Sequence, residues 1–196
     1  MAAHAHGRQG ILNAARAGVR SVEHGSLLDA EAADLLAERG VYLVADIYNG
    51  DFIASEGATQ GWPAETLAKN QATTQAQRDG FALAVKAGVK IAYGTDSGVY
   101  PHGWNARQLP YMVRHGMTPM AAIRSATVVA AELLGWQDRV GSLAPGRYAD
   151  AVAVPGDPLQ DLGLLADVPF VLQGGRVLKW EGARAPLSGG TPYWPA

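Results

Sequence analysis

Side chains that can bind a metal ion occur in three short stretches of the chain, each close to a glycine. The first stretch contains His4 and His6, the second ends with His24, and the third contains Asp96. Imidazole and carboxylate groups are ligands that suit zinc and similar divalent ions. Each stretch also follows an apolar run typical of a β-strand. The sequence therefore predicts a divalent metal site, with zinc as the preferred ion, built from the ends of successive strands.

The first stretch leaves open which histidine is the ligand. Because residues i and i+2 of a strand point to the same side, both His4 and His6 could face the site. Taken singly, each would more often be an ordinary polar residue at a strand end. Their combination with His24 and Asp96 favours ligation by one of them, and the other would then contact the ligand or the substrate.

Asp96 has two candidate roles in such a site. A carboxylate beside a metal-activated water can ligate the ion, and it can also accept the water's proton and later pass it to a leaving amine. Aspartate is common in turns as well, and a turn after Gly94 would explain it without any chemistry. The presence of the two histidine stretches favours metal ligation or proton transfer by Asp96 over a role in a turn.

Strands and helices alternate along most of the chain, which predicts an α/β fold with parallel strands. Asp29 is a suitable N-cap for one helix, and Gly40 ends that helix. Alternation along the strand before His24 should turn Glu23 away from the site, towards solvent or a helix. Residues 48–62 are rich in Gly, Asn and Asp and should form a loop. The expected strands end at residues 4–6 and cover residues 19–24, 41–47 and 89–94, and the expected helices cover residues 9–17, 30–39, 63–87, 105–115 and 118–135.

Four such strand–helix units account for residues 1–139. A closed (β/α)8 barrel of the TIM type needs eight units and usually about 250 residues, so we predict half of a barrel. Residues 140–196 differ in composition, because they begin with a turn-rich connector and continue with short strands expected at 151–154 and 170–178. We predict a small β-sandwich-type appendage there, with a loose end at residues 185–196.

Composition narrows the class of protein. With 48% hydrophobic and 17% charged residues, the 196-residue chain can bury a sizeable core. Sixteen basic against eighteen acidic residues leave a net charge of −2, which argues against binding to nucleic acid or to a membrane surface. No apolar run is long enough to span a bilayer. The absence of Cys excludes disulfides and Cys-ligated zinc but does not fix the compartment. No signal peptide is visible, which makes a cytoplasmic location the expectation.

Seven short motifs follow one another along nearly the whole chain. They are His-Ala-His-Gly at residues 4–7, Val-Glu-His-Gly-Ser at 22–26, Gly-Thr-Asp-Ser-Gly at 94–98, Pro-His-Gly at 101–103, Gly-Met-Thr-Pro at 116–119, Ala-Ala-Glu-Leu-Leu-Gly at 130–135 and Gly-Ser-Leu-Ala-Pro-Gly-Arg-Tyr-Ala-Asp at 141–150. Each motif alone is weak, but the ordered set resembles the C-terminal half of metal-dependent amidohydrolases, closest to their imidazolonepropionase-like and Xaa-Pro dipeptidase-like branch.

The resemblance implies that the chain supplies strands five to eight of a TIM-like barrel. His4 would be the strand-five ligand, His24 the strand-six ligand and Asp96 the strand-eight residue, with one or two zinc ions in the complete site. His4 is preferred to His6 because its interval to His24 is more similar to the family's interval. The family's first four strands also carry a His-x-His pair and a metal-bridging lysine, which nothing before His4 can supply here.

Four residues are candidates for binding substrate. Arg8 could clamp a carboxylate through two guanidinium nitrogens, although a solvated charge at a helix start is an equally ordinary role. Tyr48 follows the third predicted strand, where a hydroxyl could polarise a carbonyl. His102 lies in the loop after the third stretch, and His6 would contact substrate if it is not the ligand.

The resemblance implies a hydrolase of amide or peptide C–N bonds that uses metal-activated water, with dipeptide-like or cyclic amide substrates. The alternative is a non-catalytic fragment or partner subunit, because the first-half ligands are missing. Deamination of an aromatic ring, as in adenosine deaminases, is disfavoured because it needs the same His-x-His pair and a His-x-x-Glu element. In each case the open edges of a half-barrel predict self-association or pairing with a missing N-terminal half.

Overall fold

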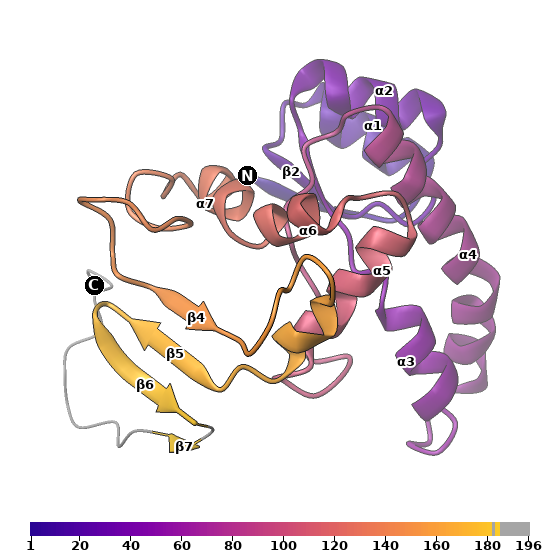
Figure 1. Cartoon of the computed structure of the whole chain (residues 1–196). Helices are drawn as coiled ribbons and strands as arrows, with labels where there is room; N and C mark the ends of the chain where they lie inside the picture. The colour runs from indigo at the N-terminus through magenta and orange to yellow at the C-terminus, as the bar shows by residue number, and fades with distance from the viewer. Residues whose placement is uncertain (182, 185–196) are drawn as a thin grey trace.

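The structure is a computed structural model that describes residues 1–181 and 183–184. It contains two sheets, one parallel and close to the N-terminus, the other antiparallel and late in the chain (Figure 1). Helices join and cover the parallel strands, so the predicted α/β fold class is confirmed. The loose end predicted at residues 185–196 lies outside the described residues.

The parallel sheet has three strands, joined by helices α1 (Arg8–Arg16) and α2 (Ala30–Arg39). Asp29 caps α2 as predicted, because its side chain accepts a hydrogen bond from the backbone N–H of Ala32 at 2.9 Å. All three strands run in the same direction, so their C-terminal ends meet at one edge of the sheet. Their order is β1 (Ala2–Ala5), β2 (Ser21–His24) and β3 (Tyr42–Val44).

The fourth strand, predicted at residues 89–94, is reduced to a single bridge between Leu43 and Ile91. Beyond the bridge the segment bonds to later elements, since Tyr93 N donates to Ser125 O at 3.0 Å. The sheet therefore ends at this segment, and the described residues do not close a barrel.

Residues 48–62, predicted to be a loop, contain helix α3 (Asn49–Glu56), so that prediction is wrong. Tertiary packing overrides the weak helix propensity of Gly, Asn and Asp. Phe52 is buried against Tyr48 and Tyr100, and this aromatic cluster holds the helix against the rest of the chain.

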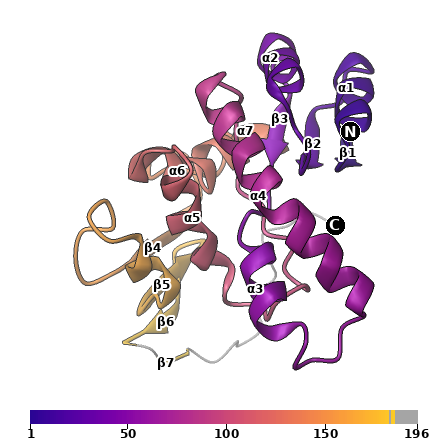
Figure 2. The ribbon, with the colours of Figure 1, turned by 90° about the vertical axis from the view of Figure 1, so that its right-hand side faces the viewer.

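Helix α4 (Ala64–Lys86) matches the helix predicted at residues 63–87. It lies beside α3, and Figure 2 shows the two helices side by side. A Cβ atom at Gly50 would come within 2.4 Å of Thr74 Oγ1. Glycine at this position therefore allows the close approach of α3 to α4.

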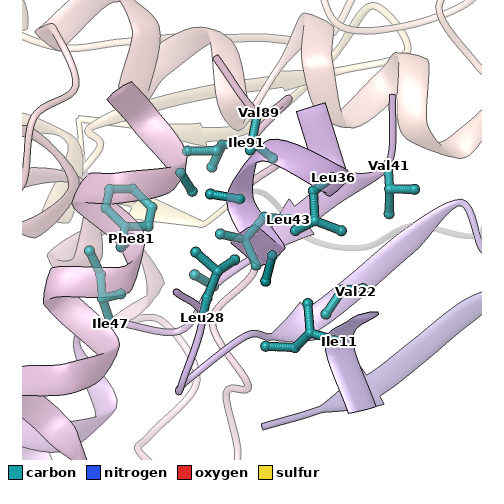
Figure 3. Packing of buried hydrophobic residues seen from close by; sticks show 14 of the residues in the cluster. Ile11, Val22, Leu28, Leu36, Val41, Leu43, Ile47, Phe81, Val89 and Ile91 are labelled. Carbon is teal, nitrogen blue, oxygen red and sulfur yellow. The ribbon is translucent and has the colours of Figure 1, made fainter. Parts of the chain in front are cut away.

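Helices α1, α2 and α4 pack apolar side chains around the parallel strands (Figure 3). Ile11 of α1, Leu36 of α2, Leu43 of β3 and Phe81 of α4 are at most 1% exposed. Full burial of side chains of this size stabilises a fold by about 1.5–3 kcal/mol each. This core fixes the positions of the strand ends that carry the candidate ligands.

The helix predicted at residues 118–135 is two helices, because Thr127 leaves helical geometry with φ of −126° and ψ of −94°. Thr118 caps the first of them and accepts from the backbone N–H of Ala121 at 3.1 Å. Pro110 lies in the first turn of a helix, where its missing N–H costs nothing. The helical elements here are η1 (Asn105–Gln108), α5 (Leu109–Arg114), α6 (Pro119–Ser125) and α7 (Val128–Leu134).

The antiparallel sheet follows in the order β4-β5-β6-β7. The strand predicted at residues 170–178 is a hairpin instead, because Gly174 and Gly175 have φ of 56° and 79° and form a two-residue turn. The elements of this part of the chain are β4 (Ala151–Ala153), the short helix η2 (Leu162–Ala166), β5 (Phe170–Gln173), β6 (Arg176–Trp180) and β7 (Ala183–Arg184).

No helix among the described residues is both long and apolar enough to cross a membrane. A domain boundary at residues 139–140 stays a prediction.

Candidate metal centre

Three histidine rings meet at the C-terminal ends of β1 and β2. The ring centroids of His4 and His6 lie 4.6 Å apart, and each lies 4.5 Å from the ring of His24. Each residue offers one nitrogen, and these three atoms lie within 4.8 Å of one another. The structure thus brings both histidines of the first stretch next to the histidine of the second.

A second group shares His24 and adds two carboxylates. One ligand atom from each of His24, Asp46 and Asp96 lies within 4.8 Å of the others. Asp46 follows β3, and Asp96 follows the segment that bridges to β3, so strand ends supply the whole group. His24 therefore links His4 to Asp96, while the binding of an ion by these three residues stays a prediction.

Asp46 is a residue of the candidate site that the sequence reasoning missed. Its Oδ1 lies 3.3 Å from Nδ1 of His24 and accepts a hydrogen bond from Gln77 Nε2 at 2.8 Å. Its Oδ2 accepts from Asn49 Nδ2 at 2.8 Å. Asp46, Asn49 and Gln77 are all buried. The sequence did contain a signal for Asp46, because it is the one carboxylate in the apolar run at residues 41–47. A buried charge needs partners, so such a residue is a candidate for a polar site.

The protonation of these groups is coupled. Burial alone would raise the pKa of Asp46, but its interactions with His24 and Asn49 outweigh burial and leave the pKa below its usual value. The interaction with Asp46 is also the main reason that the pKa of His24 is raised. Burial, followed by the charges of His24 and His4, lowers the pKa of His6. His6 therefore stays neutral to lower pH than an ordinary histidine, and the neutral imidazole is the form that binds metal ions.

The backbone is left-handed at two of the candidate ligands. His24 has a φ of 69° and Asp96 a φ of 49°, and holding a non-glycine residue in this region costs about 1–3 kcal/mol. In the strand register His24 pairs with Ala5, so a regular strand would direct its ring to the face opposite that of His4. The left-handed turn instead brings the ring beside those of His4 and His6.

The orientation predicted for Glu23 is wrong. Glu23 pairs with His4 in the register of β1 and β2, and it accepts a hydrogen bond from Ser21 Oγ at 2.5 Å. It also lines a small cavity of about 200 Å³ together with His24 and Asp96. The prediction failed because it assumed regular alternation at His24, where the backbone departs from it.

A larger cavity of about 720 Å³ opens beside the histidine rings and Asp96. Helices α3 and α4 form another part of its wall, with Ile53 from α3 and Lys69 and Thr73 from α4. Small-molecule sites are usually clefts of about 300–1,000 Å³ with mixed apolar and polar walls. The cavity is therefore large enough for a dipeptide-sized molecule next to the candidate ligands.

The other predicted substrate residues lie away from the lining of this cavity in the described part of the chain. Arg8 is exposed and forms ion pairs with Asp29, at 2.6 Å, and with Glu31. Tyr48 is buried in the aromatic cluster. His102 is exposed, with its Nδ1 3.3 Å from Ser97 Oγ. Of the four candidates, only His6 lines the cavity, and the roles of the others stay predictions.

The donor set fits a divalent ion of the zinc type. It combines imidazole nitrogens with carboxylate oxygens, which is the mixture found in catalytic zinc sites. Two of the rings also have a polar partner at Nδ1. Nδ1 of His6 lies 2.8 Å from Ser26 Oγ, and Nδ1 of His24 lies 3.3 Å from Asp46 Oδ1. Histidines that bind metal ions usually have such a hydrogen-bond partner at the ring nitrogen that does not contact the ion.

Residues 1–179 match the Amidohydrolase family, and the chain belongs to this family. This finding confirms the resemblance found in the motifs. It also agrees with the architecture described above, in which ligand-type side chains gather at the C-terminal ends of parallel strands.

Ochratoxinase from Aspergillus niger is 38% identical over 188 residues, which cover 93% of this chain and 38% of ochratoxinase. The crystal structure of a Xaa-Pro dipeptidase with bound methionine in the active site is similar with a TM-score of 0.85 and 41% identity, over 91% of this chain and 44% of that chain. A prolidase complexed with N-methylphosphonate-L-proline gives a TM-score of 0.84 and 36% identity, over 91% and 45%. The chain thus spans less than half the length of these relatives.

Proposed function

We propose that the chain is the C-terminal half-barrel of an amidohydrolase that hydrolyses amide or peptide C–N bonds with the help of a divalent metal ion, preferably zinc. Membership of the amidohydrolase family supports hydrolysis as the reaction class. The observation that carries the proposal is one cavity lined by five ligand-type side chains at the ends of parallel strands, His4, His6, His24, Asp46 and Asp96.

Different residues of the site would bind the metal ion and transfer the proton. His4 and His24 would hold the ion, with Asp96 beside them as a further ligand or as a base. The bound ion would supply Lewis-acid chemistry at the scissile carbonyl and at water. Asp96 would accept the proton of the attacking water and return it to the leaving nitrogen.

Dipeptide-like molecules are the substrate class that we favour. Two similar proteins were crystallised with methionine or with a proline derivative, and the cavity has a matching size. Lys69 is the only Lys or Arg among the described lining residues. It therefore offers a cation for the free carboxylate of a dipeptide, whereas Arg8 lies outside the lining of this cavity.

The test is to express the chain together with an N-terminal half, either the segment encoded upstream or the first half of a similar prolidase. Xaa-Pro and Xaa-Met dipeptides would be assayed with added zinc. Asp96→Asn should reduce turnover by roughly 10²–10⁴-fold because the proton acceptor is lost. Asp138→Asn, a change at an exposed aspartate outside the cavity, is the control and should leave turnover unchanged. Near-normal hydrolysis by the Asp96→Asn form would exclude the role of Asp96.

A non-catalytic partner subunit is the second candidate. It is favoured by the open edge of β1, the first strand in the order of the parallel sheet. In the same experiment, an assembled and metal-loaded complex without hydrolysis of any dipeptide or cyclic amide would support this candidate over the enzyme.

A further inference from the structure

We propose that the 720 Å³ cavity recognises its substrate by a free ammonium group, and that the side-chain carbonyls of Asn49 and Gln77 accept the hydrogen bonds of that group. The inference rests on the proposed function and deepens it, because it selects dipeptides with a free amino end over N-acyl amino acids, which contain the same type of scissile bond. It concerns substrate recognition and assigns no ligand to a metal ion.

One carboxylate fixes the orientation of both amides. Nδ2 of Asn49 donates to Oδ2 of Asp46 at 2.8 Å, and Nε2 of Gln77 donates to Oδ1 of Asp46, also at 2.8 Å. A carboxylate only accepts hydrogen bonds, so each amide must direct its NH2 group at Asp46. The carbonyl oxygen, on the other branch of each amide, is therefore left for another partner.

Neither carbonyl oxygen has a partner among the described residues. Oδ1 of Asn49 is buried and accepts no hydrogen bond there, and the donation to Asp46 is the one hydrogen bond that the side chain of Gln77 forms with those residues. Asn49 is 5% exposed and Gln77 is 9% exposed. A buried acceptor without a partner is destabilising, and a donor supplied by a ligand would remove this cost.

Both residues line the same cavity, Asn49 from α3 and Gln77 from α4. The carboxylates of Asp46 and Asp96 line it as well. A ligand group at this wall must therefore be a donor, and positive charge is favoured. An ammonium group carries three N–H donors and no acceptor, so it can satisfy both carbonyls at once, whereas the alkyl end of an N-acyl group can satisfy neither.

The rest of the α4 wall offers acceptors and a single lysine. The hydroxyls of Thr73 and Thr74 donate to the backbone carbonyls of Lys69 and Asn70, at 2.8 and 2.7 Å. Their hydrogens are thus in use, which leaves the hydroxyl oxygens to accept from a ligand.

Lys69 lies about 12 Å before Gln77 along the helix axis, at 1.5 Å per residue. An extended dipeptide spans about 7 Å, and the flexible lysine side chain can cover the remaining distance. The cavity therefore places acceptors at one end and a cation at the other, which matches the opposite charges at the two ends of a dipeptide.

The test compares two substrates of nearly equal shape, alanyl-methionine and 2-methylpropanoyl-methionine, in which a methyl group replaces the ammonium group. In the complex with an N-terminal half, kcat/KM should be about 10- to 100-fold higher for alanyl-methionine, as expected when hydrogen bonds to a charged group are lost. Calorimetric titration of the chain with each compound makes the same comparison without turnover, and the affinities should differ by a similar factor.

Two variants assign the preference to the carbonyls. Gln77→Met and Asn49→Ala should each lower the ratio of the two kcat/KM values, whereas an indirect effect through Asp46 would change both values together and leave the ratio unchanged. Gln75→Met is the matched control, because Gln75 also donates to an aspartate of α4, Asp79 at 2.8 Å, but is exposed and lies outside the cavity lining. Circular dichroism checks that each variant is folded.

Equal affinities and equal kcat/KM values for the two compounds would overturn the inference, and hydrolysis of both would still support the proposed function. A ratio unchanged by Gln77→Met and by Asn49→Ala would exclude the two carbonyls as the recognising groups. If the complex hydrolyses neither compound, the proposed function fails, while calorimetry still decides the inference. No measurable binding of alanyl-methionine would overturn it.

Discussion

Nδ1 of His24 lies 3.3 Å from Oδ1 of Asp46, so the ends of β2 and β3 are joined through the candidate metal centre. Gln77 of α4 donates to the same carboxylate oxygen at 2.8 Å. The orientation of the His24 ring is therefore tied to a residue of α4 that lies 53 positions further along the chain.

Asp46→Ala should weaken binding of Co²⁺ by about 10- to 100-fold, because the His24 ring loses the group that orients it. Gln77 and Asn49 also lose their acceptor, so the free energy of unfolding should fall by about 1–3 kcal/mol. Gln77→Ala, which removes one hydrogen bond to Asp46 and leaves the contact of Asp46 with His24, should weaken binding less than Asp46→Ala does. A folded Asp46→Ala chain with unchanged affinity would refute the orienting role.

Lys69→Met should raise KM for dipeptides in the complex with an N-terminal half and leave kcat almost unchanged, because only binding of the carboxylate is lost. Dipeptide amides, which lack that carboxylate, should show no difference between the two proteins. Lys86→Met, at the other end of α4, serves as the control. An equal rise in KM for the amides would show that Lys69 does not contact the carboxylate.

Gly50→Ala should destabilise the chain by about 1–3 kcal/mol, because the new methyl group overlaps Thr74 where α3 meets α4. Adding Thr74→Ala should restore part of the loss. Gly10→Ala is the control, since its Cβ would meet only Ala5, at the ordinary distance of 3.6 Å. That change should be neutral or stabilising because alanine is the better helix former. Urea unfolding of the unmodified chain, the two single variants and the double variant measures their free energies of unfolding. Equal stability of Gly50→Ala and Gly10→Ala would disprove the packing argument.

Asp51 should stabilise the fold in a pH-dependent way. It accepts hydrogen bonds from Arg78 at 2.6 Å and from Tyr111 at 2.5 Å. Burial acts to raise the pKa of Asp51, but these bonds lower it more, so its pKa lies below the usual 3.8. A carboxyl with a lowered pKa in the folded state stabilises the chain at pH above 3.8, and this contribution disappears as pH falls through the lowered value.

We therefore expect Asp51→Asn to be less stable than the unmodified chain at neutral pH and equally stable in acid. The carboxylate is 43% exposed, so the difference should be about 1 kcal/mol or less. Chemical unfolding across a pH series measures it. Glu65→Gln, which breaks an exposed ion pair with Lys69, should show little dependence on pH. A difference for Asp51→Asn that persists in strong acid would exclude the charge as its cause.

The chain alone should self-associate. Besides the open edge of β1, the antiparallel sheet carries an apolar groove of about 410 Å³ where Trp180, 58% exposed, packs on Phe170. Exposed apolar surface of this kind favours association. Trp180→Lys should shift sedimentation towards the monomer, whereas Leu143→Lys, at an exposed leucine outside the groove, should not. A monomeric unmodified chain at high concentration would contradict this prediction.

Residue types and spacing were enough to identify the histidine stretches and Asp96 as candidates. They were also enough for the helix between Asp29 and Gly40, because its cap and its stop are local signals. Helix α3 was missed because its stability comes from Phe52 packing on aromatic residues distant in sequence. The amino-acid composition of residues 48–62 does not indicate these tertiary contacts.

Asp46 was missed and Glu23 was misjudged for two other physical reasons. The partner that keeps Asp46 buried is Gln77, and a periodic pattern does not reveal a hydrogen bond between distant elements. The orientation of Glu23 depended on regular alternation up to His24, whose left-handed backbone breaks the pattern. Dihedral angles of this kind are set by the surrounding fold and not by the residue type alone.

The left-handed turn at His24 would also make the abundance of the protein depend on the supply of metal ions. The turn brings the three rings together only in the folded chain, so an ion bound there, as proposed, stabilises the folded state alone. At a free concentration 100 times the Kd this effect is about 2.7 kcal/mol, similar to the cost of the turn itself. Scarcity of the ion would therefore enlarge the unfolded fraction that proteases remove.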